Sequence, residues 1–475
     1  MNEFDTVIGL EVHAQLNTES KIFCSCSTKF ESPANSNICP VCCGYPGVLP
    51  VFNKKALELG IRVGLALNCK INKQIYFERK HYFYPDLPKN YQISQYKMPL
   101  GENGSLRLSS GRTIGITRVH LEEDAGKLIH KENYSLVDLN RTGNPLLEIV
   151  SEPDIASPEE AFEYLTYLKL TLQYINASDC NMEKGSLRCD ANISLKSKGV
   201  VKLGTKVELK NMNTFRGVRD ALLYEEKRQA KVYLDSGKIL QETRLWDAQA
   251  QKTEVMRTKE EACDYRYFPE PDLLDFIVAD SAVRNEKNLV GELPLDKRER
   301  FLKEYKLSVI ETDVIISERF LASFFEEACK GFNEPKKICN LLLGLFLEQV
   351  NTFEDKFKSV KISADNFAKI AKYFSQGRIN NLGTKKVLSL CIISNSNVDD
   401  IIAKEGLTQV SGEDELGLFV AQAIAENQKV VKEYLEGKEQ ALMFFVGSIM
   451  KKTKGKANPK VVKELLEKAL KNKKI

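Results

Sequence analysis

The sequence predicts an α+β protein: a domain built on a mixed β-sheet, then an all-helical domain, then a small helical tail. Apolar and polar residues alternate in the runs 7–16, 114–123 and 144–150, which is the pattern of half-buried strands. Further along the chain the alternation gives way to segments of helical spacing separated by short breakers. A chain of 475 residues is also too long for one ordinary core. We expect domains at 1–293, 294–408 and 409–475.

The composition fits an ordinary globular protein of the cell interior. Hydrophobic residues make up 43% and charged residues 28%, and the net charge of +4 permits a nucleic-acid partner without requiring one. The N-terminal stretch has no basic segment before an apolar run, and no run reaches the roughly 18 apolar residues of a membrane span. Several of the twelve cysteines stand alone, which is typical of free thiols in a reducing compartment. We expect a cytoplasmic protein without a membrane segment.

The first expected strand, residues 7–16, has one apolar face and one polar face. Ile8 and Leu10 share the apolar side, whereas Glu11 and His13 share the other. Two residues along a strand span roughly 7 Å, so this carboxylate and this imidazole lie close enough to serve one site. The polar face of the strand is therefore a candidate functional site.

Two further strands offer the same residue types. His120 and Glu122 share one face of the run 114–123, with Glu123 at the strand end, and Glu148 stands among apolar neighbours in a later run. A carboxylate on an apolar strand is costly unless it is paired or bound to a metal. Taken singly, such residues are more often salt-bridged or at a sheet edge. Three strands with the same donors favour an oxygen-rich Mg²⁺ site.

A cysteine cluster follows the first strand. Cys24 and Cys26 form a C-x-C pair, and after twelve intervening residues Cys39 and Cys42 form a C-x-x-C pair. Two close pairs joined by a short loop let four thiolates converge on Zn²⁺, normally in a structural site. A reduced cluster without metal is the alternative, and Cys43 leaves open which thiol of the second pair binds.

The stretch 77–96 combines cations with aromatic rings. Arg79 and Lys80 are candidate phosphate contacts beside an aromatic run, and a packed loop with solvated charges is the alternative. His81 stays unassigned, because a histidine in an aromatic loop is more often structural. The sequence has no G-x-x-x-x-G-K-[ST], G-x-G-x-x-G or H-R-D motif, so P-loop, Rossmann and protein-kinase mechanisms are disfavoured.

The clearest helix signal begins at Ser157. This residue fits an N-cap, Pro158 fits the first helical position, and Glu160 completes a capping-box pattern. An apolar stripe at helical spacing then runs to Ile175. We expect a helix over this segment.

The C-terminal segment 451–475 is strongly basic. It holds ten lysines and two glutamates, a net charge of +8, on a glycine-containing loop and a short helix that begins at Asn458 and Pro459. A solvated terminus that only keeps the protein in solution is one reading of this charge. Contacts to a large polyanion are the other.

The motifs together resemble one protein family. Their order is that seen in the B subunits of the aspartyl/glutamyl-tRNA(Asn/Gln) amidotransferases, the GatB/GatE family: VIGLEVHAQL, CPVCCGYPGVLPVFN, ERKHYFYPDLPKNYQISQY, HLEEDAGKL, DLNRTGNPLLEIVSEPDI, GSLRCDANIS, VELKNMNTFRGVRDALLYEEKRQ, ETRLWD and DYRYFPEPDL. The tail GSIMKKTKGKANP resembles the one that this family shares with YqeY-type proteins. The resemblance spans essentially the whole chain. It implies a catalytic cradle domain, a helical domain and a YqeY-like tail.

The resemblance implies an ATP-dependent ligase that acts on misacylated tRNA in protein biosynthesis. The side-chain carboxylate of Glu-tRNA(Gln) or Asp-tRNA(Asn) would be phosphorylated with ATP and Mg²⁺, and ammonia would then displace the phosphate. A phosphorylation step is chemically necessary, because the leaving group of a free carboxylate would be oxide.

The resemblance also assigns residues to roles. The expected metal and catalytic centre comprises Glu11, His13, Glu122, Glu123 and Glu148, with Asp190 as a further catalytic candidate. Arg79 and Lys80 would contact phosphates, and Cys24, Cys26, Cys39 and Cys42 would hold zinc. The expected tRNA contacts are Lys451, Lys452, Lys454, Lys456 and Lys460.

Partner subunits follow from what the sequence lacks. It has no amidase signature with a Ser-Ser-Lys system, and all four histidines precede residue 131, so it should not release ammonia from glutamine. The resemblance implies an amidase subunit, GatA, and a small subunit, GatC. No long insert of the GatE kind interrupts the catalytic domain. The alternatives are a non-catalytic tRNA-binding scaffold and an amidoligase that acts on free small carboxylates.

Overall fold

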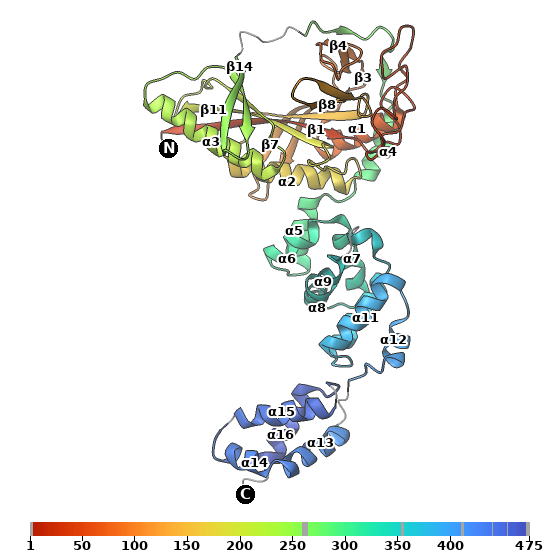
Figure 1. Ribbon diagram of the computed structural model, residues 1–475, viewed down its shortest axis with the longest axis vertical. Coiled ribbons are helices and arrows are strands. Elements are labelled where there is room, and N and C mark those ends of the chain that lie inside the picture. The colour runs from red at the N-terminus through yellow and green to blue at the C-terminus, as the bar shows by residue number, and fades with distance from the viewer. Residues whose placement is uncertain are drawn as a thin grey trace. The chain divides into compact units, whose positions relative to one another are not determined.

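Figure 1 shows the protein as a computed structural model. The structure describes residues 3–258, 265–352, 356–409, 413–438, 440–453 and 455–471. It divides into two compact units, Met1–Lys297 and Arg298–Ile475, which we describe separately. No described helix is apolar over a length sufficient to cross a membrane.

A nine-stranded mixed sheet forms the centre of the first unit, and β1 lies in its middle (Figure 1). The strand order is β14-β13-β12-β11-β1-β10-β7-β6-β2, and every neighbouring pair is antiparallel except β12 and β13. The strands are β1 Phe4–Gln15, β2 Lys70–Ile71, β6 Gly101–Arg107, β7 Thr113–Glu123, β10 Pro145–Ser151, β11 Leu187–Ser197, β12 Val207–Lys210, β13 Glu242–Asp247 and β14 Lys252–Thr258.

One face of this sheet is buried under helices. Ile8, Leu10 and Val12 of β1 are 0–1% exposed and belong to the same hydrophobic cluster as residues of three helices, among them Leu59 and Leu165. The helices are α1 Lys54–Ala66, α2 Pro158–Tyr174 and α3 Phe215–Leu234. Burying large aliphatic side chains contributes about 1.5–3 kcal/mol each, so this packing decides which face of β1 points inward.

The expected helix after Ser157 is confirmed as α2. The Ser157 hydroxyl accepts the N–H of Glu160 at 3.1 Å, and Pro158 occupies the first turn. The capping box is not closed in the expected way, because the Glu160 carboxylate accepts the N–H of Ala156 instead of that of Ser157. Of the two reciprocal hydrogen bonds of a capping box, α2 therefore has only the one that the Ser157 hydroxyl accepts.

Smaller elements flank the central sheet. They are a three-stranded sheet of β4 Glu78–His81, β5 Tyr91–Ser94 and β15 Phe268–Pro269, and two-stranded pairs of β3 Gln74–Ile75 with β16 Phe276–Ile277 and of β8 Lys127–His130 with β9 Ser135–Asp138. Helix α4 Asp280–Val290 closes the unit. A buried ion pair joins it to α1, with Arg62 Nε 2.8 Å from Glu286 Oε2.

The described part of the second unit is helical, which confirms the α+β fold class. It contains α5 Pro294–Glu304, α6 Val309–Ile316, α7 Arg319–Gly331, α8 Pro335–Leu341, a π-helix Leu342–Phe346, α9 Leu347–Val350, a 3₁₀ turn Lys356–Ser359, α10 Ala364–Ser375, α11 Asn381–Ser394, α12 Val398–Lys404, α13 Glu413–Glu426, α14 Gln428–Leu435, α15 Gln440–Lys452 and α16 Pro459–Lys471. Helix α5 begins before the border between the units. Helices α13 to α16 have a hydrophobic cluster of their own, with Leu416, Phe445 and Leu466 fully buried. The borders 1–293, 294–408 and 409–475 stay predictions.

We expect Ser157→Ala to lower the free energy of unfolding by about 1 kcal/mol, because the side chain that caps α2 is lost. Ser157→Asp is the matched control, since a carboxylate at this position also accepts the N–H of Glu160. Urea unfolding followed by circular dichroism measures both. Equal loss of stability in the two variants would show that the cap contributes nothing.

Candidate functional site

Three adjacent strands bring the predicted polar residues into one row. In the register of the sheet, His13 of β1 lies opposite Glu148 of β10, and Glu148 lies opposite His120 of β7. Glu122 is two residues from His120 and therefore shares its face. Residues far apart in the sequence thus meet on the face opposite the helices.

The side chains of this row form a compact charged cluster. His13 Nε2 lies 3.5 Å from Glu122 Oε1 and 3.4 Å from Glu148 Oε2. His120 Nε2 lies 3.2 Å from Glu148 Oε2 and 3.8 Å from Glu122 Oε2. We call His13, His120, Glu122 and Glu148 the His–Glu cluster. His120 was not among the expected metal or catalytic residues, although its shared face with Glu122 was the available signal.

The pKa values within the His–Glu cluster are strongly coupled. Burial by itself would raise the pKa of Glu148, but His120 and His13 outweigh it and hold that pKa well below the usual range. Burial likewise opposes protonation of His120, yet Glu148 and Glu122 raise its pKa to about 9. The carboxylates are therefore ionised near neutral pH, and a cation that binds here competes with the imidazole protons.

The donor set fits a divalent metal ion. Ligand atoms of His13, Glu122 and Glu148 all lie within 4.8 Å of one another. Carboxylate oxygens with one imidazole suit Mg²⁺ or Mn²⁺, and at least one side of the group remains open, since His13 is 21% exposed. Of the expected metal residues, the structure brings these three together.

Glu11 and Asp190 form a second acidic group beside the first. They lie opposite each other in the pairing of β1 with β11, and Asn192 Nδ2 donates to Glu11 Oε1 at 3.0 Å. Burial, followed by the charge of Glu148, raises the pKa of Glu11. Lys210 forms an ion pair with Asp190, and its Nζ also lies 3.0 Å from Glu208 Oε1. Glu208 and Lys210 were not among the expected site residues, although the alternation in VELK places both on one face of their strand.

Glu123 does not join the His–Glu cluster. It directly follows Glu122, so its side chain points to the opposite face of β7. Its carboxylate forms an ion pair with Lys89 and accepts the N–H of Ile93 at 2.9 Å. The family resemblance placed Glu122 and Glu123 in one metal centre. Strand alternation puts their side chains on opposite faces of β7.

Arg79 and Lys80 also point to opposite sides of their strand. The Arg79 guanidinium binds Glu270 through two hydrogen bonds of 2.7 and 2.8 Å and lies 3.1 Å from Asp272. A phosphate contact of Arg79 would require these ion pairs to open. Lys80 Nζ instead lies over the ring of Tyr265, 4.9 Å from its centroid. Neighbouring strand residues cannot reach one phosphate from the same side.

A basic cavity of about 430 Å³ adjoins the polar face. Its lining holds two acidic side chains, Asp138 and Glu183, and five cationic ones, Lys29, Lys127, Arg141, Lys184 and Arg188. Arg188 connects the cavity to the His–Glu cluster, because it lies opposite His13 in the sheet and pairs with Asp124 at 2.7 Å. Clustered cations of this kind attract phosphates or other anions.

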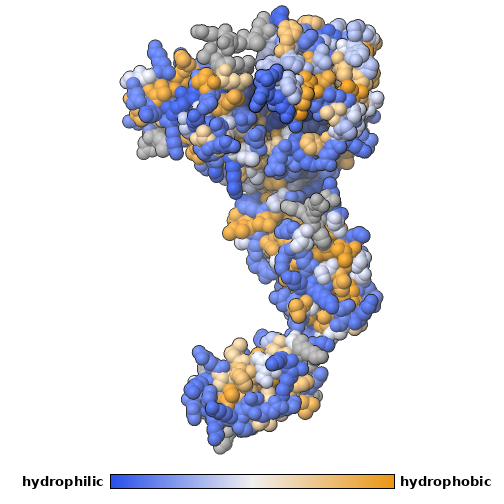
Figure 2. All heavy atoms as spheres, viewed as in Figure 1, coloured by the Kyte–Doolittle hydropathy of each residue, from blue (hydrophilic) through white to orange (hydrophobic). Residues whose placement is uncertain are grey.

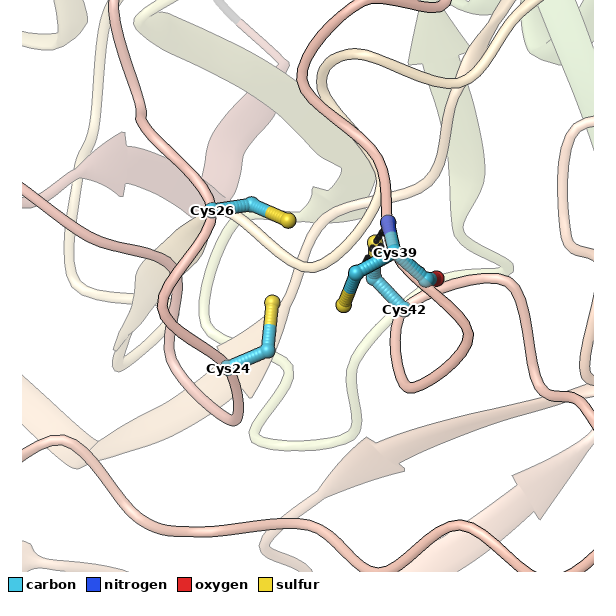
Figure 3. Close-up of side chains that lie close together, drawn as sticks. All are labelled: Cys24, Cys26, Cys39 and Cys42. Carbon is cyan, nitrogen blue, oxygen red and sulfur yellow. Dashed lines mark hydrogen bonds between the residues drawn. The ribbon is translucent and has the colours of Figure 1, made fainter.

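The four predicted cysteines come together, as Figure 3 shows. Cys24 and Cys26 approach from one loop and Cys39 and Cys42 from another, with all four sulfurs within 4.8 Å of one another. Hydrogen bonds with the Cys24 thiol and the Cys39 main chain, followed by the ammonium of Lys21, lower the pKa of Cys42 to about 4 against the effect of burial. Four converging sulfurs are a donor set that binds a metal ion. Cys43 lies outside the group, which answers the question that the sequence left open.

The fold and the site define the class of protein. Residues 6–284 match the family model of the GatB/GatE catalytic domain, and residues 323–470 match that of the GatB domain. The chain is therefore built from a catalytic domain of this kind and a helical domain of the GatB kind.

Relatives extend the match to the full length. Three are named as the B subunit of aspartyl/glutamyl-tRNA(Asn/Gln) amidotransferase: those of Thermoanaerobacter pseudethanolicus, Carboxydothermus hydrogenoformans and Brevibacillus brevis. The Thermoanaerobacter protein is 48% identical over 98% of this chain and 99% of its own length. The Carboxydothermus protein is 47% identical over 98% of both chains, and the Brevibacillus protein is 46% identical over 99% of both. The chain belongs to the family of aspartyl/glutamyl-tRNA(Asn/Gln) amidotransferase B subunits, as the motifs indicated.

We expect Glu148→Gln to weaken Mn²⁺ binding more than about tenfold. Loss of a residue that only supports a metal ligand already lowers metal affinity about tenfold, and Glu148 would be a ligand itself. Glu123→Gln removes the same charge from the opposite face of the sheet and should leave Mn²⁺ affinity within about twofold. Electron paramagnetic resonance of free Mn²⁺ measures both. Equal effects of the two substitutions would show that the His–Glu cluster is not the metal site.

Proposed function

We propose that the chain activates the side-chain carboxylate of Glu-tRNA(Gln), Asp-tRNA(Asn) or both with ATP and then amidates it. Transfer of the γ-phosphoryl group to the carboxylate gives an acyl phosphate and ADP. Ammonia then attacks the acyl carbon and expels phosphate, which leaves Gln-tRNA(Gln) or Asn-tRNA(Asn). The names of the relatives, which combine amidotransferase with both tRNAs, support this reaction.

The His–Glu cluster is the observation that carries the proposal. His13, Glu122 and Glu148 would hold a Mg²⁺ ion, which supplies neutralising charge for nucleotide phosphates. The cluster's own residues do the positioning: His120 contacts both carboxylates, so it fixes the direction in which their oxygens point. Phosphoryl transfer depends mainly on such positioning and on charge, so a rigid sheet face suits it.

The second acidic group and the basic cavity complete the proposed site. Lys210 holds Asp190 and Glu208 through ion pairs, so the carboxylates beside Glu11 keep a defined position. The cavity with Arg188 and Lys127 adds positive charge next to these acids. We assign it to anionic parts of the substrates, the nucleotide phosphates or the acceptor end of the tRNA. Lys80 and Arg79 stay candidates for further phosphate contacts.

Ammonia must come from another protein. The sequence carries no Ser-Ser-Lys amidase signature, so we propose that an amidase subunit, GatA, supplies ammonia from glutamine and that a small subunit, GatC, completes the complex. The eleven free cysteines of the described chain and the tRNA substrate support a cytoplasmic location. The four clustered thiols would hold a structural Zn²⁺ ion.

The basic tail is the proposed tRNA contact. Lys451, Lys456 and Lys460 are exposed, and Lys452 forms an ion pair of 2.6 Å with Glu426. Lys454 lies outside the described residues. Figure 2 shows hydrophilic residues over much of the visible surface of helices α13 to α16. Exposed lysines on a stable helical support can contact tRNA phosphates without folding on binding.

We expect ATP hydrolysis by the chain, assembled with its amidase and small subunits, to rise when Glu-tRNA(Gln) or Asp-tRNA(Asn) is added. Glutamine or asparagine should then be found on the tRNA after deacylation and amino-acid analysis. Glu148→Gln should abolish both signals, because the proposed metal site is lost. ATP left unhydrolysed under all conditions while tRNA still binds would favour the scaffold alternative. Turnover of a free small carboxylate without tRNA would favour the amidoligase alternative.

We expect the combined substitutions Lys451→Ala, Lys456→Ala and Lys460→Ala to weaken tRNA binding about tenfold or more and to lower its salt dependence by roughly two in the log–log slope. Filter binding over a series of salt concentrations measures both. Truncation is unsuitable, because Ile449 and Leu466 belong to the core of helices α13 to α16.

The matched control for the tail removes the same charge elsewhere in the second unit. Lys330, Lys336 and Lys385 are each paired with a glutamate, and their replacement by alanine should change tRNA affinity less than about threefold. Equal weakening by the two triple substitutions would show that net charge, and not the tail, governs binding.

A further inference from the structure

Lys21 is a lysine with no access to water and no acidic partner. Its exposed fraction is 0%, and it forms no ion pair with any aspartate or glutamate of the described residues. Its Nζ donates instead to Cys42 Sγ at 3.6 Å. An ammonium ion removed from water is costly unless a negative group lies against it. The sulfur of the cysteine cluster is therefore the group that must carry this negative charge.

The position of Lys21 is held by its own main chain. Its N–H donates to the carbonyl of Cys26 at 3.0 Å, and its carbonyl accepts Nδ2 of Asn53 at 3.2 Å. Asn53 is the N-cap of α1, so Lys21 connects the cysteine cluster to the core of the first unit. The side chain of Lys21 passes Gly143, where a Cβ atom would lie in ordinary van der Waals contact, 3.6 Å from Lys21 Cδ. The main chain of Lys21 is therefore held on both sides, and its buried ammonium has Cys42 Sγ as hydrogen-bond partner.

The acidic side chains that line the neighbouring cavity, Glu123 and Asp272, are already paired. Glu123 and Lys89 line the same cavity of about 200 Å³ as Cys24 and Cys42, and they form an ion pair with each other. Glu123 also accepts the N–H of Ile93. Asp272 in turn lies 3.1 Å from Arg79, so both acids of this cavity have partners other than Lys21.

We infer that Lys21 is the built-in counter-charge of a four-thiolate zinc centre and that it holds the zinc in place. Four thiolates around Zn²⁺ carry a net charge of −2, and a buried ammonium against one sulfur offsets half of it. The same contact explains why a lysine is tolerated inside the protein. Lys21 is a positioning residue for the zinc ligands and takes no part in the proposed transfer to tRNA. The inference rests on the proposed zinc site and is independent of the proposed reaction.

The test compares zinc retention in full-length Lys21→Met and in the wild-type chain. Methionine keeps the length and burial of the side chain but removes its charge. We expect the purified wild type to contain one zinc ion per chain and Lys21→Met to release zinc to a chromogenic chelator about 10- to 100-fold faster, the range for outer partners of metal sites. Lys55→Met is the control, because Lys55 is an exposed lysine at the start of α1. It should release zinc at the wild-type rate.

Thermal unfolding separates a counter-charge from ordinary packing. With zinc bound, Lys21→Met should lower the melting temperature. After zinc is stripped and the thiols are reduced, the same substitution should lower the melting temperature less, because the ammonium then faces the single thiolate of Cys42 instead of a centre of net charge −2. An equal loss of stability with and without zinc would overturn the inference, as would a wild type that contains no zinc or an unchanged release rate.

A second variant covers the case in which Lys21→Met does not fold. Replacing Cys26 by histidine changes the centre to three thiolates and one imidazole, which lowers its negative charge by one. In the double variant Lys21→Met, Cys26→His, folding and slow zinc release should therefore return toward the values of Cys26→His alone. Failure of the double variant to fold or to keep zinc, when Cys26→His alone does both, would contradict the counter-charge role.

Discussion

The antiparallel register of β1 between β10 and β11 is the constraint on which the site depends. It places His13 opposite Glu148, which in turn lies opposite His120. Because side chains alternate along a strand, a slip of one residue would turn His13 toward the core and Leu10 toward the polar face. The burial of the apolar half of β1 under the helices opposes such a slip. Core packing therefore specifies the geometry of the site on the other face.

In the first unit, cationic side chains compensate the negative charge of acids and thiols. Two acidic groups of the site have a cation within ion-pair distance: the buried Glu148 has His120, and the partly exposed Asp190 has Lys210. The cysteine cluster follows the same rule through Lys21. Low-dielectric surroundings make these pairs strong and make an unpaired charge expensive. A divalent cation on the polar face would displace imidazole protons, so the site is balanced both with and without the ion.

The two units suit different parts of the proposed function. Phosphoryl transfer requires charged groups at fixed separations, and the strands of a wide sheet hold them by backbone hydrogen bonds and a shared core. Binding of a large polyanion requires accessible positive charge more than fixed geometry. Helices α13 to α16 provide this with a small core of their own, from which Lys451, Lys456 and Lys460 extend into solvent.

The sequence by itself determined the α+β class, the helix that begins at Ser157, the face of His13 and Glu11 on their strand, and the four cysteines. Periodicity, capping and spacing are local properties, so they can be read directly. Tertiary structure alone decided that Arg79 is paired with Glu270, that Glu123 is paired with Lys89, and that Lys21 is buried against Cys42. These outcomes depend on register and packing between segments far apart in the chain, and alternation within one strand says which face a side chain occupies but not what it meets there.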